Sequence, residues 1–95
     1  MKKILVFTLN GCVHCQELKE KLTELSIPFD DVEITLNRKL WDYVISQTGY
    51  DLLPTVFIKD GDDSSGLIYT PGRDFQSNDE IIEIIKNLYS ESNFR

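Results

Sequence analysis

The residues best suited to chemistry are Cys12 and Cys15, the only two cysteines of the 95-residue chain. They form a C-x-x-C motif with Val13 and His14 between them. A disulfide between residues this close would close almost no loop, so it would remove little entropy from the unfolded chain and could not act as a structural staple. Any use of the pair is therefore chemical, and a redox dithiol, a metal site and an inert pair are the alternatives.

A metal site is the weaker alternative. Cys12, His14 and Cys15 offer three ligands, whereas a closed structural zinc site takes four, and His14 is the only histidine. Adjacent residues of a helix also point in different directions, so His14 and Cys15 are poorly placed to share one ion. We therefore expect no metal and favour the redox dithiol.

The segment before the cysteines contains two lysines and an apolar run, which loosely suggests a lipoprotein signal with a cysteine anchor. The run from Ile4 to Leu9 is no longer than the minimum of about 7 residues for the apolar core of a signal peptide, and Thr8 interrupts it. A short apolar run is typical of a buried strand in a parallel sheet. We interpret it as that strand.

The elements that must position the cysteines follow from apolar periodicity. Strands are predicted at 4–9, 29–34, 54–59 and 66–70. A first helix begins at the cysteines, with Cys15, Leu18, Leu22 and Leu25 on its buried face, and stops before Pro28. The second is capped by Thr35 and closes at Gly49, and the third covers 77–89 with Ser77 and Glu80 in capping-box spacing.

The predicted order is β-α-β-α-β-β-α, which implies an α/β fold with a four-stranded mixed sheet flanked by helices. We expect one domain over 1–95, with a loose tail at 90–95. The segment 60–66 is predicted to be a hairpin turn. A calcium loop is disfavoured because Gly66 stands at the seventh place rather than the sixth and no glutamate closes the loop.

A strand-to-helix junction gives the two cysteines different roles. Cys12 would lie at the helix N-terminus, where free N–H groups favour an anion, so we expect it to be the nucleophile. Cys15, one turn deeper, could then attack a mixed disulfide formed on Cys12. His14 would stabilise the Cys12 thiolate if its imidazole lies close to it, or else would simply face solvent.

The motif "CVHC" after a first strand, followed later by Pro54 opening another strand, resembles the glutaredoxin branch of the thioredoxin fold. The stretch "WDYVISQTGYDLLPTV" is most similar to the small glutaredoxin-like redoxins that reduce ribonucleotide reductase. The resemblance implies a cis peptide bond before Pro54, facing the cysteines. It also implies that Val13, Leu53 and Pro54 contact the substrate, with the Leu53 backbone available to an extended peptide.

The chain departs from that family where typical members hold glutathione. Val13 and His14 replace Pro-Tyr within the motif, and the usual Gly-Gly-acidic segment reads Pro71-Gly72-Arg73-Asp74. Candidate glutathione contacts are therefore Arg38, Lys39, Gly72, Arg73 and Asp74, although the basic ones could equally be solvated surface charges. Dependence on glutathione is left open.

These observations predict a cytoplasmic, monomeric dithiol–disulfide oxidoreductase that reduces a protein disulfide and needs no cofactor, with glutathione or thioredoxin reductase as the source of electrons. The formal charge of −6 disfavours nucleic acid and anionic membranes as partners. Two other functions compete with this one. The first is an iron–sulfur carrier, in which Cys12 from two subunits and two glutathiones hold the cluster, and the second is a non-catalytic binding module that uses the Leu53–Pro54 groove.

Overall fold

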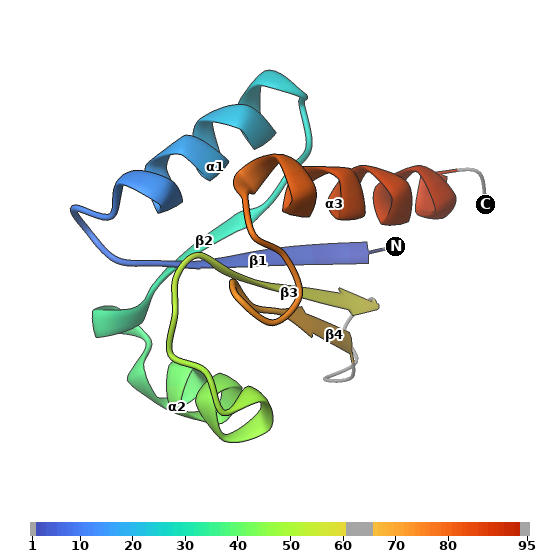
Figure 1. Ribbon diagram of the computed structural model, residues 1–95. Helices are drawn as coiled ribbons and strands as arrows, with labels where there is room; N and C mark the ends of the chain where they lie inside the picture. Colours follow the sequence, from blue (N-terminus) through green and yellow to red (C-terminus); the bar gives the residue numbers. More distant parts are fainter. Residues whose placement is uncertain (1, 61–65, 94–95) are drawn as a thin grey trace.

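The computed structural model describes residues 2–60 and 66–93, which form one mixed sheet covered by helices (Figure 1). The strands are β1 (Lys2–Thr8), β2 (Asp30–Glu33), β3 (Thr55–Asp60) and β4 (Gly66–Tyr69). The helices are α1 (Val13–Glu24), α2 (Arg38–Thr48) and α3 (Asn78–Asn93), and a short 3-10 helix, η1 (Ile34–Leu36), precedes α2. The predicted fold class and element order are confirmed.

The sheet has the strand order β2-β1-β3-β4. β1 pairs parallel with β2 and antiparallel with β3, so that Phe7 lies opposite Val32 on one side and Thr55 on the other. β4 pairs antiparallel with β3 and forms an edge of the sheet. The parallel pair needs the crossover that α1 supplies, and the antiparallel pair of β3 and β4 follows directly in the chain.

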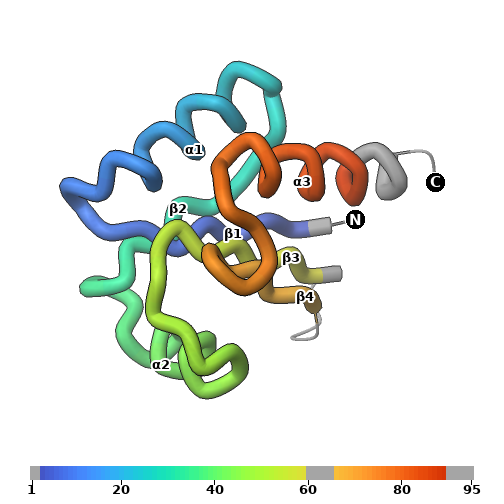
Figure 2. The backbone as a smooth tube through the Cα atoms, in the orientation of Figure 1, coloured from blue at the N-terminus to red at the C-terminus, as the bar shows by residue number. Residues whose placement is uncertain are grey.

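Two core clusters lie on opposite faces of the sheet, because successive side chains of a strand point in opposite directions. On one face, α1 and α3 pack together, and Leu18, Leu22 and Ile81 are among their buried residues. On the other face, α2 contributes Trp41 and Val44. Figure 2 shows α1 and α3 on one side of the strands and α2 on the other.

The predicted cap of the second helix is wrong. Thr35 lies inside η1, where its N–H donates to the Glu33 carboxylate at 2.6 Å and its hydroxyl donates to the same group. α2 begins only after Asn37, which makes no side-chain capping bond. Glu33 therefore holds Thr35 in the 3-10 turn η1, and α2 begins at Arg38 instead of directly after Thr35.

Several other element ends differ from prediction, most of them by one or two residues. β1 ends at Thr8 rather than Leu9, and α1 ends at Glu24, so Leu25 becomes its C-cap and is 45% exposed instead of buried. α3 continues to Asn93, so residues 90–93 are helical rather than part of a loose tail. Most of the predicted turn at 60–66, and residues 94–95, lie outside the described residues.

The predicted capping box of α3 is formed in part, because the Glu80 side chain binds the N–H of Gln76 instead of that of Ser77. The Glu80 N–H donates to the Ser77 hydroxyl oxygen at 3.3 Å, and the Glu80 carboxylate accepts a bond from the N–H of Gln76. Across 2–60 and 66–93, no helix combines the length and apolar character needed to cross a membrane.

Leu22 and Leu25 offer a matched test of this packing. Leu22 is fully buried between α1 and the sheet, so we expect Leu22→Ala to lower the free energy of unfolding by about 3 kcal/mol through lost burial and a residual cavity. Leu25→Ala should cost less than about 1 kcal/mol, since that side chain is already 45% exposed. Urea unfolding of both variants measures the difference, and equal losses would contradict the observed end of α1.

Candidate active site

The turn between β1 and α1 places Cys12 at the beginning of the helix. The Cys12 N–H donates to the Leu9 carbonyl at 3.0 Å, and Gly11 between them has a φ of +91°, a value that strains any other residue. Cys12 itself is extended and serves as the N-cap of α1. The end of a buried strand thus leads directly to the cysteine pair.

The Cys12 sulfur takes the part that an oxygen side chain usually plays at a helix N-cap. It accepts a hydrogen bond from the Cys15 N–H at 3.3 Å, and the first turn of α1 contains no acidic residue. Free N–H groups and the helix dipole favour an anion at this position. Cys12 is also partly exposed, as an attacking group must be.

Cys15 is the deeper of the two thiols, with 1% of its surface exposed. Burial, together with the hydrogen bond and charge of Cys12, raises the pKa of Cys15 from 9.0 to about 12. Cys15 therefore stays protonated near neutral pH. This asymmetry suits Cys12 as nucleophile and Cys15 as resolving thiol, and both roles remain predictions.

The predicted cis peptide bond is present between Leu53 and Pro54. Pro54 is buried directly before β3, and the register of β3 with β1 sets Thr55 opposite Phe7, near the end of β1 that leads to Cys12. In the part of the chain that the structure describes, no hydrogen bond involves the Leu53 backbone. Val13, beside Cys12, is 69% exposed. The substrate-contacting roles of Val13, Leu53 and Pro54 remain predictions.

His14 faces solvent. Its side chain is 77% exposed, and its Nδ1 lies 4.0 Å from the Glu17 carboxylate one turn along α1. Its carbonyl oxygen accepts a bond from the Asn78 side chain at 3.0 Å, which links the first turn of α1 to the start of α3. These contacts favour the solvent-facing alternative, and a role for His14 in stabilising the thiolate remains a prediction.

The candidate glutathione contacts do not form one basic site. Arg73 is engaged within its own loop, donating to Asp74 at 2.9 Å and to the Ile68 carbonyl at 2.8 Å, and it lies 6.0 Å from the Tyr50 ring centroid. Partial burial acts to raise the pKa of Asp74, but bonds from Arg73 and the Thr70 N–H outweigh it and lower that pKa. Both charges are thus used internally.

The other candidates are spread over two elements. Gly72, with a φ of +88°, lies in the loop before α3, whereas Arg38 and Lys39 are exposed residues of the first turn of α2. Among the described residues, no hydrogen bond or ion pair joins Arg38 or Lys39 to the loop that holds Gly72 and Arg73. Glutathione contacts at these residues remain predictions.

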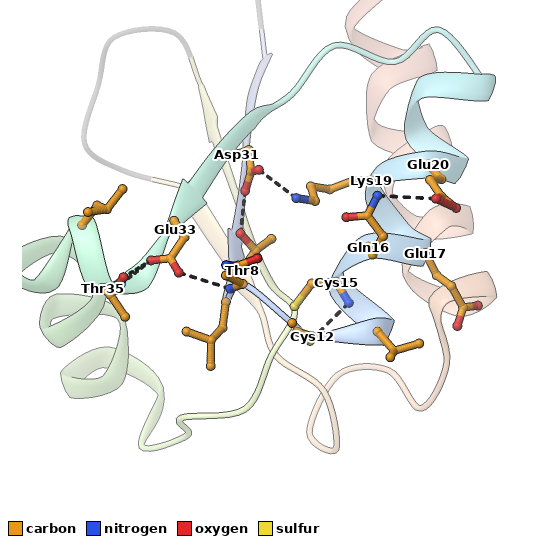
Figure 3. Close-up of a pocket in the computed structure, with 15 residues that line it drawn as sticks. Thr8, Cys12, Cys15, Gln16, Glu17, Lys19, Glu20, Asp31, Glu33 and Thr35 are labelled. Carbon is orange, nitrogen blue, oxygen red and sulfur yellow. Dashed lines mark hydrogen bonds and ion pairs between the residues drawn. The ribbon is translucent and has the colours of Figure 1, made fainter.

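A groove of about 810 Å³ opens beside the cysteines on the side of α1, β2 and η1 (Figure 3). Both cysteines line it, and so do four acidic residues and one lysine: Glu17, Glu20, Asp31, Glu33 and Lys19. Leu53, Pro54 and Arg73 do not line this groove, so the cysteines have two distinct flanks. The described residues contain no group of three or more His, Cys, Asp or Glu side chains that could hold a metal ion.

The sequence reasoning missed a bonded trio along this groove. The Asp31 carboxylate accepts a bond from the Thr8 hydroxyl at 2.5 Å and pairs with the Lys19 ammonium at 2.9 Å. Partial burial acts to raise the pKa of Asp31, but these two bonds hold it below its usual range. The sequence contains one indication that Lys19 lies near the cysteines: Cys15 and Lys19 are four residues apart, which puts both residues on one helix face.

The family model for glutaredoxin matches residues 4–62, which include the cysteine pair and the cis proline. Fold and cysteine arrangement together define a small thiol–disulfide redox domain of the thioredoxin fold. The chain belongs to the glutaredoxin family, a family of thiol–disulfide oxidoreductases.

Two relatives share part of the sequence. The gene 56 protein of Mycobacterium phage L5 is 38% identical over 53 residues, which are 56% of this chain and 52% of that protein. The chain thus spans about half the length of the phage protein. The N-acetyl-S-hydroxy-L-cysteine reductase of Bacillus subtilis is 31% identical over 64 residues, 67% of this chain and 69% of the relative.

Solved structures agree on the fold. The glutaredoxin-like protein NrdH-redoxin from Escherichia coli superimposes with a TM-score of 0.58 at 24% identity, over 75% of this chain and 84% of that one. A malarial protein gives a TM-score of 0.60 at 17% identity, over 92% of this chain and 96% of that one. At these identities the likeness shows the fold alone.

The two thiols should differ sharply in reactivity. A thiol with a pKa of about 12 is ionised in roughly one molecule in ten thousand at pH 8, and Cys15 is also buried, so iodoacetamide should label Cys12 and leave Cys15 unmodified. Peptide mass spectrometry of the reduced, native protein measures this. In guanidinium chloride both should react, and equal labelling of the native protein would overturn the assignment.

Proposed function

We propose that this protein reduces disulfides in other proteins through a Cys12–Cys15 dithiol cycle. The observation that carries the proposal is the arrangement of the pair: Cys12 is accessible and hydrogen-bonded at the helix N-terminus, with the protonated Cys15 buried one turn behind it. A nucleophile backed by a resolving thiol is what dithiol exchange requires.

The cycle has two exchange steps. The Cys12 thiolate attacks one sulfur of the substrate disulfide, forms a mixed disulfide and expels the other sulfur as a thiolate. Cys15 loses its proton and attacks the Cys12 sulfur, which forms the Cys12–Cys15 disulfide and releases the second substrate thiolate. Both thiolates end as thiols, two electrons pass to the substrate, and no resident cofactor takes part.

An extended substrate segment would bind beside the cis proline. Among the described residues the N–H and carbonyl of Leu53 have no hydrogen-bond partner, so they can pair with a peptide backbone, and the exposed Val13 adds apolar contact next to Cys12. The Leu53 backbone and the Val13 side chain therefore suit a protein substrate. Ribonucleotide reductase is the specific protein substrate that the redoxin resemblance suggests.

For the source of electrons we favour thioredoxin reductase over glutathione. Arg73 is occupied by its own loop, and the groove at Cys12 is lined by four carboxylates against one lysine, which opposes an anionic tripeptide. The E. coli NrdH-redoxin is described as a glutaredoxin-like protein with a thioredoxin-like activity profile. We expect the protein to act as a monomer in the cytoplasm.

The first test removes the nucleophile. Cys12→Ser should reduce the rate of insulin disulfide reduction to background, because serine forms no reactive anion near neutral pH. The assay follows insulin turbidity with dithiothreitol as reductant. Substantial remaining activity would exclude Cys12 as the attacking group.

The second test removes the resolving thiol. Cys15→Ser should still attack a substrate disulfide but fail to release it, so covalent complexes should accumulate on non-reducing gels and disappear with dithiothreitol. The Cys12→Ser, Cys15→Ser double variant is the matched control and should form none. Turnover of protein substrate by Cys15→Ser at the rate of the parent protein would argue against the dithiol cycle.

The third test identifies the reductant. NADPH is supplied with either thioredoxin reductase or glutathione plus glutathione reductase, and its oxidation is followed at a fixed insulin concentration. We expect turnover at least about tenfold faster with thioredoxin reductase, since one unfavourable charge contact of about 1.4 kcal/mol changes a rate constant tenfold. Faster turnover with glutathione would reverse this choice of reductant and leave the dithiol cycle intact.

The Bacillus relative supports a second substrate class for the same cysteines. Its name assigns it the reduction of N-acetyl-S-hydroxy-L-cysteine. Here Cys12 would attack the sulfur of the S-hydroxy group and release water, and Cys15 would then release the small thiol and form the intramolecular disulfide. Release of N-acetylcysteine by the reduced protein, but not by Cys12→Ser, measures this activity.

A further inference from the structure

We infer that Lys19 is a positioning residue for the second exchange step, in which its ammonium group stabilises the thiolate that Cys15 must form. The inference rests on the proposed dithiol cycle and adds a group to it. Within the described structure the Lys19 ammonium pairs with Asp31 and forms no hydrogen bond to the attacking Cys12 sulfur, so it would act through Cys15.

Lys19 is held on the same side of α1 as Cys15. The two residues are four apart on α1, which stacks them on one helix face, and both line the groove beside the cysteines. The Lys19 side chain is only 26% exposed, compared with 42% for Lys21 on the same helix. The charge is therefore partly shielded from water and acts more strongly than a surface charge.

The ammonium is fixed rather than free to move. It lies 2.9 Å from one carboxylate oxygen of Asp31 on β2, and the other oxygen accepts the Thr8 hydroxyl at 2.5 Å. Thr8 is 2% exposed at the end of the central strand β1. Figure 3 shows Lys19 reaching from α1 to Asp31, with Thr8 on the other side of that carboxylate.

The second exchange step requires a thiolate at Cys15, whose pKa is raised. In the dithiol, burial and Cys12 raise the pKa of Cys15, whereas a backbone hydrogen bond from Leu9 and the charge of Lys19 act to lower it. Once Cys12 is bound in a mixed disulfide, its own charge is gone. Lys19 is then the one positive charge among the residues that line the groove.

Other ionisable groups line the same groove and also act on a Cys15 thiolate. They are Cys12, Glu17, Glu20, Asp31 and Glu33. The carboxylates oppose a second anion, and Asp31 does so while it holds the ammonium in place. The net benefit of Lys19 is therefore measured by removing its charge alone.

The structural alternative is that the ion pair simply ties α1 to the sheet. In that case Lys19→Met and Asp31→Asn should behave alike, because each breaks the same pair. If the charge of Lys19 acts on Cys15, the two variants should differ: Lys19→Met loses the positive charge, whereas Asp31→Asn keeps it and loses an opposing negative one.

The two steps can be timed separately with Ellman's reagent. Reduced protein should release one equivalent of thionitrobenzoate when Cys12 attacks and a second when Cys15 resolves the mixed disulfide. Cys15→Ser identifies the first phase because it should show only that one. Stopped-flow absorbance gives both rates for each variant.

Lys19→Met should slow the second phase about tenfold at pH 7 and change the first less than about twofold, as expected when one charge moves a thiol pKa by about one unit. The second-phase rate should rise with pH in the parent protein and in Lys19→Met, and the curve of the variant should lie about one unit higher on the pH axis. Lys19→Arg should restore most of the rate. Lys21→Met, which removes a lysine paired with Asp79 on the other side of α1, is the matched control and should change neither phase.

An unchanged second phase in Lys19→Met, or equal slowing of both phases, would overturn the inference. If Lys19→Met does not fold, Asp31→Asn still decides, because asparagine can still accept a bond from the Lys19 ammonium while the opposing negative charge is lost. A faster second phase in that variant supports the inference, and an unchanged or slower one overturns it. Absence of a first phase in the parent protein would instead refute the proposed function itself, so the two failures are distinguishable.

Discussion

Strand β1 is hydrogen-bonded along both edges, to β2 and to β3, and its side chains from Ile4 to Thr8 are buried on both faces of the sheet. A shift of one residue would move every one of them to the opposite face, so the register is strongly specified. The end of β1 is therefore a fixed point, and the Leu9–Cys12 turn starts there. The same register sets Thr55, the residue after Pro54, opposite Phe7, near the end of β1 that leads to Cys12.

Much of this fold was predictable because long apolar patterns determine which residues are buried. The strands around Val6 and Val56 and the helical faces of Leu18 and Ile81 all follow from periodicity alone. The errors lie at element ends, where a few local bonds decide. Thr35 has the right chemistry for a cap, but Glu33, two residues earlier, binds both its N–H and its hydroxyl.

The candidate site likewise has one part that the sequence predicted and one part that it did not. The placing of Cys12 at a helix N-terminus and the cis bond before Pro54 came from a local motif and a family resemblance. The groove on the α1–β2 side did not, because Thr8, Lys19 and Asp31 come from three elements and no short motif links them. Nor could the sequence show that Arg73 is held by its own loop rather than free for a ligand.

The single tryptophan gives the two-faced core a spectroscopic consequence. Trp41 is 4% exposed and packs 5.6 Å, centroid to centroid, from Phe7, in the cluster that α2 covers. The cysteine-bearing helix α1 packs on the opposite face. Indole fluorescence should therefore report the integrity of the α2 layer, while staying largely silent to local rearrangement at the start of α1. An optical signal of unfolding is thus available that is separate from the redox state of the thiols.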